Sequence, residues 1–147
     1  NKVSKFLGLA SSILSMQSAY KEHQKNGETK ATQMMETLIG AGIWYLPTSK
    51  ELWTGYSSKE ALRLNESSEE HMYPRKIQGA KLLMLDWSNI DDPEQYLKDL
   101  YYEKLGKFHK VSKKENKQLV PYQKAGVFTT PEDAYAKVGI ELVYVRG

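Results

Sequence analysis

The chain has 147 residues, a mass of 16.8 kDa, 40% hydrophobic residues and a formal net charge of +3. This length predicts one domain with one buried core, over residues 1–147. Because the sequence contains no cysteine, a disulfide scaffold, a thiolate zinc site and a cysteine nucleophile are excluded. The longest apolar runs are far shorter than the ~20 residues of a membrane span, so we expect a soluble, cytoplasmic protein without a membrane partner.

The first forty residues have the apolar spacing of helices. Apolar side chains from Val3 to Tyr20 recur at helical intervals, and Gly27 is a suitable end for this helix. A second helix is expected from Thr29 to the glycines at 40–42. The sequence therefore predicts an N-terminal helical segment over residues 1–40.

The apolar period changes after residue 42. The runs 43–46 and 51–56 are short, aromatic and apolar, which predicts two short strands or a strand and a bend. Ser57 or Ser58 can cap a brief helix that ends near Leu64.

The second half of the chain alternates helices and strands. The expected elements are a helix at 77–87, a helix at 93–105, a strand at 107–111, a helix from the capping box Ser112–Glu115 through Leu119, a helix at 130–138 and a strand at 140–145. The segment 129–147 thus holds a C-terminal helix and strand. The predicted fold class is α+β and helix-rich.

Seven lysines lie between Lys104 and Lys124, whereas the preceding part of the chain is acidic. A basic face of this kind suits a protein that binds phosphodiesters, because each neutralised phosphate releases counterions. A solvated lysine-rich surface is the alternative interpretation.

The candidate chemistry lies in residues 67–76, where Glu70 and His71 are followed by Pro74, Arg75 and Lys76. Hydrolysis of a phosphodiester on one divalent ion needs a base, a metal ligand and cations near the developing charge. Neutral histidine suits the base because its ordinary pKa is about 6.5. In a strand, Glu70 and His71 point to opposite faces, so they share a site only if the strand ends there and the backbone turns.

The run from Glu70 to Arg75 resembles the acid-His-x-x-Pro-basic core of the His-Me finger, or HNH, nucleases. The strand at 107–111 and the capped helix after it resemble the second half of that ββα-metal element. The resemblance implies that Glu70 is a metal ligand, His71 the general base and Asn116 a second ligand. It places the ββα-metal core at residues 66–120.

The chain also departs from that family. An insertion at 77–106 separates the two strands where the family has a compact loop. Asn116 can instead hold the loop that carries the base, and Gln123 is then the nearest later polar residue. His109 is an exposed strand residue, a DNA contact or a stand-in ligand.

The resemblance implies a metal-dependent DNA endonuclease or nickase, acting on double-stranded DNA with Mg²⁺ or Mn²⁺ and of phage or mobile-element type. The expected phosphate contacts are Arg75, Lys76, Lys110, Lys113, Lys114 and Lys117. One alternative is a non-catalytic nucleic-acid-binding or protein-interaction domain that uses the Lys104–Lys124 face. Another is a small regulatory protein that acts on a second protein.

Overall fold

The computed structural model describes residues 3–125 and 131–145. These residues form two compact units, each built from two segments of the chain. The helical unit holds the residues up to Pro47 together with Arg75–Tyr101. The sheet unit holds Thr48–Pro74 together with the residues from Tyr102 onward. The chain therefore passes between the units after Pro47, after Pro74 and after Tyr101.

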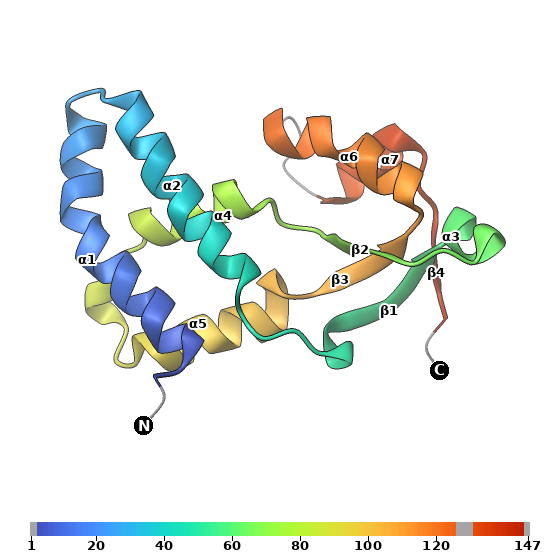
Figure 1. Cartoon of the computed structure of the whole chain (residues 1–147), viewed down its shortest axis with the longest axis horizontal. Helices are drawn as coiled ribbons and strands as arrows, with labels where there is room; N and C mark the ends of the chain where they lie inside the picture. Colours follow the sequence, from blue (N-terminus) through green and yellow to red (C-terminus); the bar gives the residue numbers. More distant parts are fainter. Residues whose placement is uncertain (1–2, 126–130, 146–147) are drawn as a thin grey trace. The chain divides into compact units, whose positions relative to one another are not determined.

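The helical unit begins with a helical hairpin of α1 (Lys5–Lys25) and α2 (Thr29–Trp44), which lie side by side in Figure 1. Ser4 caps α1, since its hydroxyl oxygen accepts a hydrogen bond from the backbone N–H of Leu7. Gly27 has a φ of 70°, which allows the tight turn between the helices. Both helices were predicted from the sequence.

The predicted end of α2 at residues 40–42 is wrong. The helix continues to Trp44, and the expected strand at 43–46 is absent, with Ile43 fully buried inside the helix. The glycines have a packing role instead. A Cβ on Gly40 would lie 2.7 Å from the backbone oxygen of Arg75, and one on Gly42 would lie 2.7 Å from a methyl group of Leu9.

The insertion between the predicted strands supplies the rest of the helical unit. It contains α4 (Arg75–Met84), the 3₁₀-helix η2 (Trp87–Asn89) and α5 (Pro93–Leu100), and it leads into the π-helix η3 (Tyr101–Leu105). Helix α4 packs on α2 and α5 packs on α1. The insertion is therefore an ordered part of the helical core rather than a long loop.

Two polar side chains complete the interior of this unit. Gln17 lies on the otherwise apolar face of α1, and its amide donates to the carbonyl oxygens of Leu83 and Leu85 at the end of α4. The Tyr20 hydroxyl donates to the Glu36 carboxylate at 2.6 Å. Burial, the hydrogen bond and the charge of Glu36 raise the pKa of Tyr20 to about 12, so this phenol stays protonated.

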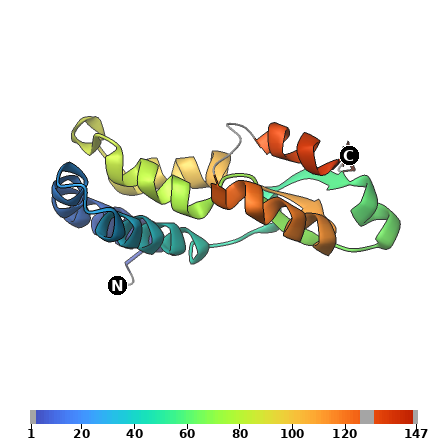
Figure 2. The same ribbon diagram turned by 90° about the horizontal axis from the view of Figure 1, so that it is seen from above.

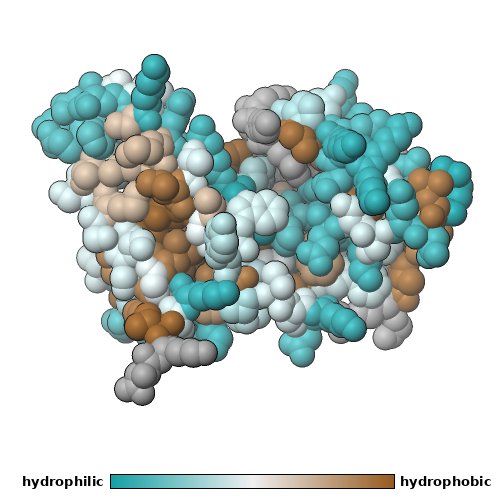
Figure 3. All heavy atoms as spheres, viewed as in Figure 1, coloured by the Kyte–Doolittle hydropathy of each residue, from teal (hydrophilic) through white to brown (hydrophobic). Residues whose placement is uncertain are grey.

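The surface of the helical unit carries exposed apolar side chains on α1 and α2. Figure 3 shows brown, hydrophobic surface over these helices. Exposed large hydrophobic side chains of the two helices include Leu7 and Leu14 on α1 and Met34, Leu38 and Trp44 on α2. Across the described part of the chain, each helix is too short or too polar to cross a bilayer.

The sheet unit contains one four-stranded mixed sheet with the strand order β2-β3-β1-β4. Strand β1 (Trp53–Ser58) pairs in parallel with β3 (Phe108–Val111) and antiparallel with β4 (Leu142–Tyr144), and β2 (Ser68–His71) pairs antiparallel with β3. The remaining elements are η1 (Lys50–Leu52), α3 (Lys59–Leu64), α6 (Lys113–Ala125) and α7 (Pro131–Val138).

Two predicted caps join helices to this sheet. The Ser112 hydroxyl accepts from the N–H of Glu115, and the Glu115 carboxylate accepts from the N–H of Ser112, which confirms the capping box. Ser58 caps α3 by accepting from the N–H of Ala61. Because the Ser58 hydroxyl also donates to Glu115, the two caps form one buried network.

Helices α6 and α7 lie close to the sheet strands, as the view from above shows (Figure 2). Their buried cluster consists of Leu119, Ala134, Tyr135 and Ile140, with Met72 of the sheet side packed against it. The helix-rich α+β class is confirmed. Strands β2 and β3 form an antiparallel pair with a long insertion between them, and helix α6 follows β3.

Candidate functional site

His71 is the last residue of β2 and lies in a row of three rings across the sheet. In the strand register, His71 pairs with Phe108 of β3, and Phe108 pairs with Trp53 of β1. The ring centroids of His71 and Phe108 are 5.8 Å apart. Strand pairing therefore brings together three rings that are far apart in the sequence.

Trp53 and Phe108 of this row line a groove of about 740 Å³. Its other lining residues are Thr48, Ser49, Lys50, Ser67, Glu69 and Lys110. The Lys110 ammonium lies 4.0 Å from the centroid of the Trp53 ring. We call this the ring groove. The sequence predicts His71 and Lys110 as site residues, but it misses Trp53, Phe108 and Lys50.

The other face of the sheet carries a second polar group. Glu70 pairs with His109 across β2 and β3, and both are buried, with exposures of 3% and 8%. The Thr54 hydroxyl and Nδ1 of His109 are 2.6 Å apart. The ring of Tyr135, from α7, lies edge-on to His109 with centroids 5.7 Å apart. Glu70 and His109 therefore face the helices, whereas His71 lies on the opposite face of the sheet, beside Phe108.

Burial controls the protonation of this second group. It lowers the pKa of His109 below its ordinary value, and the nearby charge of Glu132 only partly opposes that shift. Burial, together with the charges of Glu70 and Glu132 and the nearby Tyr73, raises the pKa of Tyr135. His109 is thus a neutral imidazole and Tyr135 a neutral phenol at physiological pH.

We expect the free energy of unfolding to fall as the pH drops from about 7.5 to about 5.5, because unfolded His109 binds a proton below about 6.5 that folded His109 does not bind. The stabilising effect of neutral His109 is complete above a pH of about 6.5 and is lost as the pH falls further. Urea unfolding at both pH values measures it. In His109→Gln the fall should be smaller than in the wild type. An unchanged fall in His109→Gln would contradict the assignment.

Asn116 lies in the first turns of α6 and faces β2. Its side-chain nitrogen donates to the Ser68 hydroxyl at 3.0 Å. Ser68 is three residues before His71, about 10 Å along the strand. The contact joins α6 to the first residue of β2, the strand that ends in His71. The side chain of Gln123 lies outside the described residues.

The implied metal donors do not share a site with the implied base. Glu70 and His109 offer one carboxylate and one imidazole side by side, on the face opposite to His71. Among the residues that the structure describes, no group of three or more histidine, aspartate and glutamate side chains is arranged to hold a metal ion. The described donors therefore do not fit a preformed metal site beside His71.

The predicted phosphate contacts are spread over several elements. Lys110 lies in the ring groove, whereas Lys113, Lys114 and Lys117 lie on α6 and line a separate surface hollow. Arg75 and Lys76 begin α4 and belong to the helical unit. The Arg75 guanidinium lies over the Trp44 ring, 4.7 Å from its centroid. The structure thus brings one of these six cations into the groove beside the row of rings.

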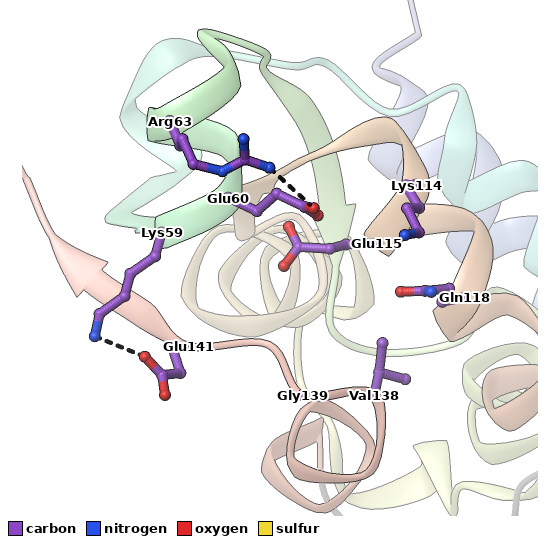
Figure 4. A pocket seen from close by; sticks show the side chains of 9 residues that line it. All are labelled: Lys59, Glu60, Arg63, Lys114, Glu115, Gln118, Val138, Gly139 and Glu141. Atoms are coloured by element: carbon purple, nitrogen blue, oxygen red, sulfur yellow. Dashed lines mark ion pairs between the residues drawn. The ribbon is translucent and has the colours of Figure 1, made fainter.

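A further cavity of about 390 Å³ lies between α3, α6 and the end of α7, and Figure 4 shows its lining side chains. Two of its cations are paired with carboxylates. Lys59 lies 2.6 Å from Glu141, and Arg63 lies 3.6 Å from Glu60. Because these pairs largely neutralise the positive charge of the cavity, we expect it to bind phosphate more weakly than the ring groove.

Comparison of the chain with protein-family models, with curated proteins and with solved structures found no match.

Proposed function

We propose that this protein is a DNA endonuclease or nickase in which His71 is the general base. The observation that carries the proposal is the position of His71 in the ring row, next to a groove that contains aromatic rings and the cations of Lys50 and Lys110. A base, a cationic surface and aromatic rings in one place are what binding and hydrolysis of a nucleic-acid strand require.

In this mechanism, a ring nitrogen of His71 removes a proton from a water molecule. The water oxygen attacks the phosphorus atom, and the bond from phosphorus to one bridging oxygen breaks. The departing oxygen takes a proton from solvent, so the products are a phosphate monoester and a hydroxyl group. Contact with Phe108 restricts the orientation of the His71 ring. Lys110 offsets the negative charge of the substrate.

The resemblance to HNH nucleases adds a divalent ion, Mg²⁺ or Mn²⁺, to the proposal. Such an ion, when bound, would stabilise negative charge on the reacting phosphate. The adjacent donors Glu70 and His109 are buried, with exposures of 3% and 8%, and they do not form a metal site beside His71. Since these donors face away from His71, the support for the ion is the resemblance.

The test is incubation of supercoiled plasmid with the full chain, in Mg²⁺, in Mn²⁺ and in EDTA. We expect conversion to nicked or linear plasmid with either ion and no conversion in EDTA. Gel electrophoresis measures the conversion. Persistence of supercoiled plasmid in both ions would refute the nuclease.

The second candidate is a nucleic-acid-binding domain without catalysis. The lysines of α6 and the ring groove favour it, because they bind phosphates and bases whether or not His71 acts as a base. This function predicts salt-sensitive DNA binding together with intact plasmid in every metal.

A further inference from the structure

We infer that the ring groove binds an unpaired base, so that the preferred substrate of this protein is single-stranded or locally opened DNA. The inference rests on the proposed function in one respect, namely that the ligand is a DNA strand. It adds the strand state of the substrate and assigns a binding role to Trp53, which lies two strands away from His71.

The stacking surface of the groove is the ring of Trp53, which is half-buried, whereas Phe108 is only 6% exposed. Trp53 and Phe108 are register partners on adjacent strands, so their side chains leave the sheet on the same face. The indole nitrogen of Trp53 donates to the carbonyl oxygen of Tyr56 at 2.9 Å, which holds the ring in one orientation. A fixed aromatic ring can stack against any base, because every base has a π face.

The polar groups of the groove match a nucleotide. Lys50 and Lys110 are cations that can meet phosphate oxygens, and Thr48 and Ser49 supply hydroxyl groups. Among the described residues that line the groove, Glu69 is the carboxylate, and it pairs with Lys110 in the strand register. Excess positive charge beside aromatic rings is typical of single-strand binding surfaces.

The distance from the groove to His71 also suits a strand. Neighbouring strands are about 4.8 Å apart, so Trp53 and His71, on either side of β3, are separated by about 10 Å. A base stacked on Trp53 therefore brings the adjoining phosphates of its own strand close to His71. In an intact duplex the bases stack on each other, and their faces cannot reach Trp53.

The experiment measures binding without cleavage. Fluorescence anisotropy of a labelled oligothymidylate, and of the duplex formed with its complement, is recorded with the His71→Ala protein in EDTA. We expect the single strand to bind about tenfold more tightly than the duplex. Adding Trp53→Ala should weaken single-strand binding about tenfold and leave duplex binding unchanged.

Trp44→Ala in the same His71→Ala protein is the matched control. Trp44 is also a partly exposed tryptophan with a cation over its ring, but it belongs to the helical unit. The Trp44→Ala substitution should leave the affinities for the single strand and for the duplex unchanged. Lys50→Glu is a second groove variant, at an exposed position, and should weaken single-strand binding without lowering the melting temperature.

Equal binding by the Trp53→Ala and Trp44→Ala proteins would overturn the inference if the Trp53→Ala protein melts as a folded chain. If that protein does not fold, unchanged single-strand binding by Lys50→Glu overturns it. Because no cleavage is involved, these results are independent of the plasmid assay. Plasmid cleavage without preference for single strands would leave the nuclease standing and remove the base-binding role of the groove.

Discussion

Replacing His71 with alanine should reduce plasmid cleavage about 10²- to 10⁴-fold, the range of general-base catalysis. The methyl group cannot take a proton from water, whereas Lys110, Trp53 and the α6 lysines remain in place to bind DNA. DNA affinity should therefore change little. Initial rates of supercoil loss and anisotropy with the same DNA measure the two effects separately.

Two further variants make this result specific. His23→Ala removes a partly exposed histidine of the helical unit and should cleave at the wild-type rate. His109→Ala alters the covered face of the sheet, so any loss of activity should accompany a lower melting temperature. Wild-type cleavage by a folded His71→Ala protein would eliminate His71 as the base.

Gly79→Ala should destabilise the protein by about 2–3 kcal/mol, although alanine normally stabilises a helix by about 1 kcal/mol relative to glycine. A Cβ on Gly79 of α4 would overlap the backbone oxygen of Glu36 and lie 2.8 Å from the backbone nitrogen of Gly40. The backbone of α2 cannot turn aside as a flexible side chain can, so the two helices must separate. Urea unfolding measures the loss.

Gly8→Ala is the control for this substitution. Gly8 also lies inside a helix, α1, but a Cβ there has no atom within 4 Å beyond its immediate surroundings. This variant should gain about 1 kcal/mol, since only helix propensity changes. If both alanine variants are equally stable, the close approach of α2 and α4 has no energetic consequence.

Local signals predicted most helices of this fold. Gly27 ends the first hairpin helix, Ser58 caps α3, and the Ser112–Glu115 box starts α6, because each signal depends on a few neighbouring residues. The glycines at 40 and 42 were misread as a helix end. Glycine is needed at these positions because Gly40 closely approaches the backbone of Arg75 and Gly42 closely approaches the side chain of Leu9. The local sequence does not reveal either contact.

The candidate site was predictable only in part. The local spacing of Glu70, His71 and Pro74 identifies residues 67–76 as a candidate segment. The alternation of side chains along a strand places Glu70 and His71 on opposite faces of the sheet, as the structure does. The ring groove was not predictable, because it requires the parallel pairing of β1 with β3. Trp53 and Phe108 become neighbours through that pairing alone, and no motif connects them.

The interleaving of the two units has a consequence for dissecting this protein. A fragment that starts at Thr48 keeps every strand of the sheet, but it also keeps α4 and α5 without α1 and α2. Apolar residues such as Leu83 and Leu97 would then lose their covering and promote aggregation. The sheet unit is better isolated by replacing the whole 75–101 segment with a short linker, because lengthening or shortening a flexible connection costs little free energy.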